Sequence, residues 1–159
     1  MTNFSATDHG EIETIITHRK TMPGAMLPIL HAIQEKIGYI PAEAVPLIAE
    51  QLNVSRAEVH GVVSYYHFFR QQPSGKHIVQ ICRAEACQAN GGSALAEHAS
   101  SALGCDFHAT TADGQFTLEP VYCLGQCGCA PAMMLGDELH ARMTPEKFDQ
   151  LISAKRNTP

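Results

Sequence analysis

The sequence lacks tryptophan, any excess of basic residues and any long hydrophobic run. Its 11 lysine and arginine residues are outnumbered by 16 aspartate and glutamate residues, so the formal net charge is -5. A general nucleic-acid-binding protein normally carries a basic face, so no nucleic-acid partner is expected. No apolar stretch approaches the roughly 20 residues that are needed to cross a bilayer, so no membrane span is expected either.

The first ten residues, MTNFSATDHG, contain neither the basic segment nor the apolar segment of a secretory signal peptide. We therefore expect a cytoplasmic protein, and in that compartment disulfide bonds are disfavoured. Hydrophobic residues make up 45% of the sequence, which is enough apolar mass for a packed core and argues against a disordered chain. A length of 159 residues suits one large domain or two small ones.

The first half of the chain contains no cysteine, and its apolar residues recur at helical spacing. This periodicity predicts four short amphipathic helices, at residues 11–20, 26–37, 41–52 and 56–69. Pro46 leaves the start of the third helix open, whereas Ser55 and Glu58 match the S-x-x-E capping box before the fourth. His60 and His67 would both lie on the fourth helix, and we interpret them as surface or interface residues rather than metal ligands.

A cluster of breaker residues, Gln71–Gly75, separates this helical segment from one with a different pattern. Beyond the cluster, a buried strand, a helix, two hairpins and a final helix are predicted. These elements are expected at residues 76–82, 94–103, 107–122, 132–141 and from 144 onward. The predicted fold class is therefore α+β, with an N-terminal four-helix region at residues 1–73 and an α/β domain at residues 74–159.

All six cysteines lie in the second half of the chain, at positions 82, 87, 105, 123, 127 and 129. Cys82 and Cys87 form a C-x4-C motif, and Cys123 and Cys127 form a C-x3-C motif. Each motif is expected just past the end of a predicted strand, where α/β folds place their binding sites. Four thiolates from two such loops can converge on one point, which indicates a metal or redox centre.

The spacing of these motifs favours a [2Fe–2S] cluster over a single zinc ion. Zinc sites typically use C-x2-C, and neither pair has that gap, whereas a two-iron cluster takes four thiolates. A structural zinc-binding docking module is the alternative, while a thiol oxidoreductase would need a C-x-x-C motif that the sequence lacks. Spacing alone leaves open whether Cys127 or Cys129 completes the set, and Cys105 is expected to be a spare thiol.

The segments KHIVQICRAEACQANGG and EPVYCLGQCGCAPAMML resemble the small [2Fe–2S] subunit of complex I and its relatives, which have a thioredoxin-like ferredoxin fold. The upstream segments LPILHAIQEKIGYIP and VSRAEVHGVVSYYHFFR are similar to the helical region of that family, so the resemblance covers about residues 20–155. Within the family, CRAEACQA and HGVVSYYHFF are most similar to the gamma subunit of soluble, molybdenum- or tungsten-containing, NAD-dependent formate dehydrogenases.

The resemblance implies a ligand set and a function. Carried over position by position, Cys82, Cys87, Cys123 and Cys127 would bind the iron atoms of one [2Fe–2S] cluster, and Cys129 would be an addition to the pattern. The chain would then transfer single electrons and have no catalytic residues of its own. Arg83, next to the first ligand, is a candidate cation beside the cluster.

The same resemblance implies the partners of the chain. A flavoprotein subunit would carry FMN, [4Fe–4S] and an NAD site, and a large subunit would oxidise formate at molybdenum or tungsten. Residues 1–73 would dock against the flavoprotein, with the stretch Tyr65–Arg70 suited to that contact, and residues 74–159 would form the thioredoxin-like [2Fe–2S] domain. The alternative is the same subunit in complex I or in an NAD-linked hydrogenase, because no residue distinguishes these assemblies.

Overall fold

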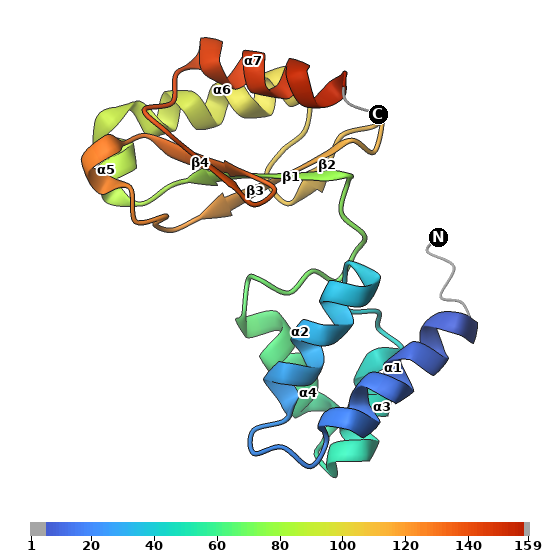
Figure 1. Ribbon diagram of the computed structural model, residues 1–159. Helices are drawn as coiled ribbons and strands as arrows, with labels where there is room; N and C mark the ends of the chain where they lie inside the picture. Colours follow the sequence, from blue (N-terminus) through green and yellow to red (C-terminus); the bar gives the residue numbers. More distant parts are fainter. Residues whose placement is uncertain (1–5, 158–159) are drawn as a thin grey trace. The chain divides into compact units, whose positions relative to one another are not determined.

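The structure is a computed structural model in which residues 6–157 are described (Figure 1). The chain divides into two compact units, Met1–Pro73 and Ser74–Pro159. The helices of the first unit are α1 (Ala6–Arg19), α2 (Met26–Ile37), α3 (Ala44–Leu52) and α4 (Arg56–Tyr65). All four predicted helices are therefore present, although α1 starts earlier than the periodicity indicated and α3 starts later.

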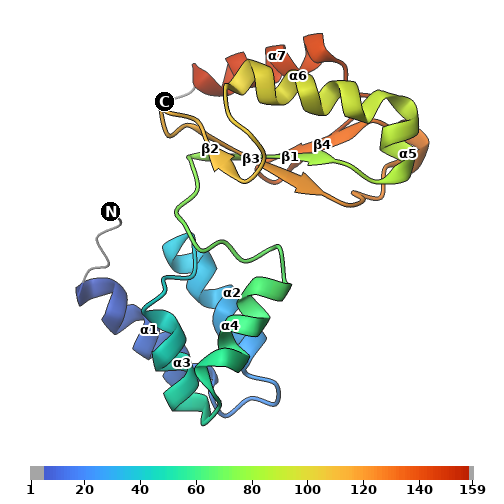
Figure 2. The same cartoon turned by 180° about the vertical axis from the view of Figure 1, so that it is seen from behind.

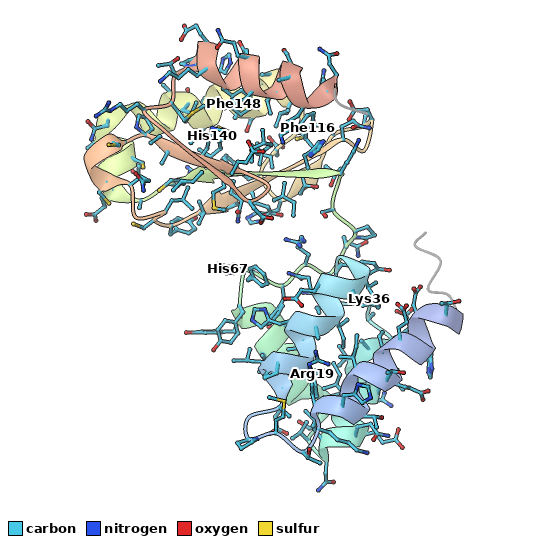
Figure 3. The ribbon with its side chains drawn as sticks, viewed as in Figure 1. Arg19, Lys36, His67, Phe116, His140 and Phe148 are labelled. Atoms are coloured by element: carbon cyan, nitrogen blue, oxygen red, sulfur yellow. The ribbon has the colours of Figure 1, made fainter. Side chains whose placement is uncertain are left out.

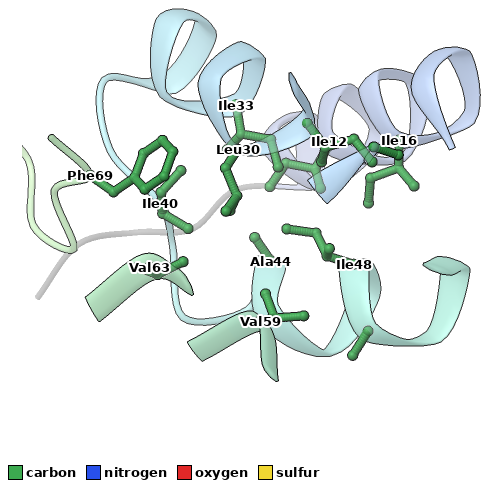
Figure 4. Packing of buried hydrophobic residues seen from close by; sticks show 13 residues of the cluster. Ile12, Ile16, Leu30, Ile33, Ile40, Ala44, Ile48, Val59, Val63 and Phe69 are labelled. Atoms are coloured by element: carbon green, nitrogen blue, oxygen red, sulfur yellow. The ribbon is translucent and has the colours of Figure 1, made fainter. Parts of the chain in front are cut away.

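The helices of the first unit pack around a core of branched aliphatic side chains (Figure 4). Ile12 and Ile16 enter this core from α1, Leu30 and Ile33 from α2, and Ile48 from α3, and all five are fully buried. Burying one such side chain contributes about 1.5–3 kcal/mol. Isolated helices of this length are only marginally stable in water, so packing against this core is what stabilises them.

Two of the helix boundaries are set by local signals that the sequence displays. Gly38 ends α2 in the left-handed conformation at φ 93°, and its N–H donates to the carbonyl of Gln34 at 2.8 Å. Ser55 begins α4, because its hydroxyl accepts from the N–H of Glu58 while the Glu58 carboxylate accepts from the N–H of Ser55. The predicted capping box is thus confirmed.

The end of α4 differs from the prediction, because the helix stops at Tyr65 rather than running to Phe69. The reason is tertiary: the buried Gln34 donates from Nε2 to the carbonyl of Phe68 at 2.8 Å, and its Oε1 accepts from the N–H of Arg70 at 2.7 Å. The second bond takes the Arg70 N–H, which would donate to the carbonyl of Tyr66 if the helix continued to Phe69. His67 consequently lies beyond the helix, and its expected place on the same helix as His60 is wrong.

The second unit is built on one five-stranded sheet in the order β2-β3-β1-β4-β5 (Figure 2). The strands are β1 (His77–Cys82), β2 (Ala109–Thr110), β3 (Phe116–Val121), β4 (Ala132–Leu135) and β5 (Glu138–Ala141). The pair β1–β3 is parallel, and the other neighbours are antiparallel. The two predicted hairpins are therefore present as β2–β3 and β4–β5.

Two helices, α6 (Ser93–Leu103) and α7 (Pro145–Arg156), lie side by side over one face of this sheet (Figures 1 and 2). Phe116 from β3 and Phe148 from α7 are fully buried in the layer between helices and sheet (Figure 3). The mixed α and β fold class matches the prediction. Within residues 6–157, no helix combines the length and apolarity that a membrane crossing requires.

Candidate metal centre

The two cysteine motifs meet because β1 and β3 run parallel as neighbours. Their register places Cys82, the last residue of β1, beside Val121, the last residue of β3. The N–H of Arg83 donates to the carbonyl of Val121 at 2.7 Å, so the two segments stay together as they leave the sheet. Cys123 follows only two residues later. Parallel strands leave a sheet at the same edge, so both motifs lie at one site.

The first cysteine pair is buried. Cys82 and Cys87 are 2% and 3% exposed, and the Cys87 thiol is hydrogen-bonded to the Cys82 sulfur. Cys87 belongs to the short helix α5 (Glu85–Cys87), which the sequence patterns did not predict. The chain then makes a wide turn in which Gly91 adopts a positive φ of 88°, a conformation that glycine allows without strain. This turn connects the buried pair to α6.

The second cysteine pair is exposed. The Sγ atoms of Cys123 and Cys127 lie 3.8 Å apart, and a short 3-10 helix, η2 (Cys127–Cys129), follows. Cys123 and Gly125 have φ values of 94° and 75°, so the chain doubles back between the two thiols. Two thiolates held at about 2.3 Å from one tetrahedral metal ion would lie about 3.8 Å apart. The spacing of this pair therefore fits two ligands of one metal atom.

Main-chain N–H groups surround the sulfur atoms. The Cys82 sulfur accepts hydrogen bonds from the amides of Ala84, Cys123 and Leu124, so the second motif directly contacts the first. The Cys87 sulfur accepts from the amide of Ala132, and the Cys123 sulfur accepts from the amide of Gly125 at 3.4 Å. Amide dipoles arranged in this way stabilise negative charge on thiolate ligands.

The pKa shifts of the thiols reflect the same contacts. Burial alone would raise the pKa of Cys82, but the main-chain donors and the Cys87 thiol together lower it. Burial raises the pKa of Cys87, and its bond to Cys82 adds to the effect. The pKa of Cys127 is raised by its hydrogen bond to Cys123, by the charge of Cys123 and also by that of Cys82. Cys82 and Cys127 belong to different pairs, so the two pairs lie close enough for the charge of one thiolate to act on the other.

This donor set fits a two-iron cluster. The four thiols form two pairs, and a [2Fe–2S] cluster takes two thiolates for each iron. Cys82, Cys87, Cys123 and Cys127 could supply these four ligands.

The remaining candidate residues lie differently from these four. Cys105 is half-buried against the core of the sheet unit, and burial raises the pKa of its thiol. Cys129 is half-buried, and its main-chain carbonyl accepts from the N–H of Arg142 at 2.8 Å. The guanidinium of Arg83 lies 5.1 Å from the centre of the Phe107 ring. Sequence reasoning missed this stacking contact, and it could not identify which amides contact the sulfurs, because main-chain donors leave no residue-type signal.

Comparison with known proteins gives matches over most of the chain. The family model described as thioredoxin-like [2Fe-2S] ferredoxin matches residues 12–156. A subunit of NADH-quinone oxidoreductase from Pseudomonas aeruginosa is 35% identical over 151 residues, covering 95% of this chain and 91% of the relative. The HndA subunit of the NADP-reducing hydrogenase from Solidesulfovibrio fructosivorans is 30% identical over 143 residues, covering 90% and 84% of the two chains.

A solved structure has the same fold. The crystal structure of NAD+-reducing [NiFe]-hydrogenase in the air-oxidized state contains a chain that matches with a TM-score of 0.66 and 23% sequence identity. The match covers 80% of this chain and 22% of that chain, so the fold described above forms about one fifth of a longer polypeptide there.

Proposed function

Because the chain belongs to the thioredoxin-like [2Fe–2S] ferredoxin family, we propose that it is the electron-transfer subunit of an NAD-dependent oxidoreductase complex. Members of this family carry one [2Fe–2S] cluster, and this chain carries one as well. The observation that supports the proposal most strongly is the pairing of the four thiols at one sheet edge. Relatives that are themselves named as subunits of NAD(P)-linked complexes support it further.

In this proposal, each part of the site has its own task. Cys82, Cys87, Cys123 and Cys127 bind the two iron atoms as thiolates, and the bound cluster exchanges one electron at a time. The amides around the sulfurs stabilise the negative charge that reduction increases. The buried pair anchors the site in the protein, whereas the exposed pair lies toward a partner. The chain itself needs no catalytic side chain for this role.

We further propose that the complex is a cytoplasmic NAD-dependent formate dehydrogenase. The likeness of CRAEACQA and HGVVSYYHFF to the gamma subunit of those enzymes supports this assignment. Its partners would be a flavoprotein with FMN, [4Fe–4S] and an NAD site, and a large molybdenum or tungsten subunit that oxidises formate. NADH-quinone oxidoreductase or an NAD(P)-linked hydrogenase fits the relatives equally well, because substrate chemistry lies on other chains.

The first unit is proposed as the docking bundle of the subunit. Three large apolar side chains at the end of α4 are exposed: Tyr65 at 76%, with Tyr66 and Phe68. The two hydrogen bonds from Gln34 fix the main chain at Phe68 and Arg70, so the aromatic stretch has a defined conformation. Exposed aromatic residues are enriched in protein interfaces, which supports a contact with the flavoprotein.

Purification of the intact complex from its native host tests this function. We expect two iron and two sulfide per chain, a rhombic EPR signal after reduction, and co-purification of a flavoprotein and a formate-oxidising subunit. A colourless chain that contains zinc would instead support a structural docking module. Co-purification with hydrogenase or quinone-reducing subunits would keep the electron-transfer role and replace the formate assignment. Fractionation of the same cells tests the cytoplasmic location.

A further inference from the structure

The charges of the second unit are distributed unevenly along the sequence. Between Lys76 and Arg142 the only lysine or arginine is Arg83, whereas seven Asp and Glu residues fall in the same stretch. This stretch contains all five strands and both cysteine motifs. Arg83 directly follows Cys82, so the one permanent cation of the stretch lies next to a proposed ligand of the cluster.

The main chain of Arg83 is bound to both cysteine loops. Its N–H donates to the carbonyl of Val121 at 2.7 Å, two residues before Cys123, and its carbonyl accepts from Nε2 of Gln88 at 2.6 Å. The first bond holds Arg83 against the strand that leads to the second motif, and the second bond closes the loop that carries Cys87. Neither bond uses the side chain of Arg83, so substitution of that side chain leaves both in place.

The guanidinium of Arg83 lies on an aromatic ring rather than against a carboxylate. Its central carbon is 5.1 Å from the centre of the Phe107 ring, within the range of a cation–π contact, and Phe107 is itself packed against the core of the sheet unit. None of the ion pairs among residues 6–157 involves Arg83. Glu119, the acidic residue of β3, is paired with His108 instead. The positive charge of Arg83 is therefore held in place and is not neutralised by an ion pair.

A cation held beside the cysteines favours the reduced form of a bound cluster. Reduction adds one negative charge to a centre that four thiolates already make anionic, and a nearby positive charge stabilises that increase. Building on the proposed function, we propose that the guanidinium of Arg83, positioned by Phe107, raises the reduction potential of the [2Fe–2S] cluster. Arg83 supplies the charge, and Phe107 is a positioning residue that acts through it.

The test is a redox titration of the full chain with its cluster, using dithionite as the reductant and the EPR signal of the reduced cluster as the readout. Arg83→Gln removes the charge, whereas Arg83→Lys keeps it. Glu85→Gln is the matched control, because Glu85 is an exposed residue of the same loop with the opposite charge. Phe107→Leu removes the ring and is measured alone and in combination with Arg83→Gln, while Phe107→Tyr keeps the ring. Iron content and urea unfolding of each variant establish that it is folded and loaded.

Arg83→Gln should make reduction about three- to tenfold less favourable, because unit charges separated by about 10 Å near a protein surface interact with about this strength. A tenfold change in a one-electron equilibrium constant equals about 59 mV. Glu85→Gln should shift the potential in the opposite direction, and Arg83→Lys and Phe107→Tyr should stay within about twofold of wild type. Phe107→Leu should lower the potential by less than Arg83→Gln does, and it should add no further shift to that variant.

Three results would overturn the inference: an unchanged potential in Arg83→Gln, an equal loss in Arg83→Lys, or a shift of the same sign in Glu85→Gln. A shift from Phe107→Leu that persists in the Arg83→Gln background would overturn the positioning role of Phe107. If the wild-type chain gives no EPR signal of a reduced [2Fe–2S] cluster, the proposed function itself fails.

Discussion

The sulfur atoms of Cys123 and Cys127 lie 3.8 Å apart at the surface, while Cys82 and Cys87 form a hydrogen-bonded pair that is almost completely buried. One sheet edge thus presents two thiol pairs of the same chemistry in different surroundings. This contrast determines how the site should respond to mutation and to chemical probes.

Serine substitution of each cysteine in turn tests the ligand assignment. Cys82→Ser, Cys87→Ser, Cys123→Ser and Cys127→Ser should each lose the cluster or shift its EPR signal strongly, because serine replaces a thiolate ligand. Cys105→Ser and Cys129→Ser are the matched controls and should keep the wild-type signal and iron content. If Cys129→Ser has the same effect as Cys127→Ser, the assignment of Cys127 is wrong.

Alkylation of the cluster-free chain tests the difference in exposure. We expect iodoacetamide to modify Cys123 and Cys127 first, and Cys82 and Cys87 only when the domain unfolds, as measured by peptide mass spectrometry. The lowered pKa of Cys82 favours its reactive thiolate form, but burial prevents contact with the reagent. Early modification of Cys82 would show that the first cysteine loop opens in the absence of the cluster.

Gln34→Leu should destabilise the first unit by about 2 kcal/mol in urea denaturation, because the carbonyl of Phe68 and the N–H of Arg70 both lose their buried partner. Gln51→Leu is the matched control, because the Gln51 side chain accepts an exposed hydrogen bond from Lys20, whose loss should cost about 0.5 kcal/mol or less. Equal effects of the two substitutions would contradict the role of Gln34 in fixing the end of α4.

Two glycine substitutions should have opposite signs. Gly75→Ala should destabilise the chain by about 1–3 kcal/mol, because the added Cβ would lie 2.9 Å from main-chain atoms of Gly114 and Phe116. Gly61→Ala should stabilise it by about 0.5–1 kcal/mol, because Gly61 is exposed within α4 and nothing lies near its missing Cβ. Thermal or urea unfolding measures both, and a stabilising Gly75→Ala would show that the chain at this point can move aside.

The stability of the second unit should fall in mild acid because of His77. Its ring lies 5.5 Å from the Phe116 ring, its Nε2 is buried, and burial together with Lys76 and Lys155 lowers its pKa below 6.5. Below pH 6.5 the His77 ring takes up a proton more readily in the unfolded chain than in the folded chain. The contribution of neutral His77 to the free energy of unfolding is therefore complete above pH 6.5 and is lost as the pH falls through the folded pKa. His77→Gln should therefore show a weaker dependence of unfolding free energy on pH in this range. Identical pH profiles would contradict this account.

Most element boundaries could be predicted because they depend on local signals. The turn at Gly136-Asp137 and the cap at Thr144, whose hydroxyl accepts from the N–H of Lys147 at 3.3 Å, act within a few residues. The end of α4 could not be predicted, because it depends on Gln34, a residue of α2 that lies two helices earlier in the chain. Periodicity describes a helix face and carries no information about a distant hydrogen-bond partner.

The cysteine site likewise has some features that local sequence predicts and others that depend on distant residues. Motif spacing and the predicted strand ends identified two thiol pairs, but their meeting depends on the parallel register of Cys82 and Val121. No local sequence pattern predicts which strands pair with each other in the sheet. The sequence also could not predict that the amides of Leu124 and Ala132 contact the sulfurs, because every residue except proline carries such a donor.

The parallel pairing of β1 and β3 has a consequence for how the protein matures. The proposed ligands come from two loops between which α6 and β2 must fold, so neither loop alone can complete the site. An unfinished or misfolded domain would offer at most half of the thiols and could not hold both iron atoms. Binding of all four proposed ligands to one cluster therefore requires the folded β1–β3 pair, so the iron content of a preparation should report the fraction of chains in which this sheet edge has formed.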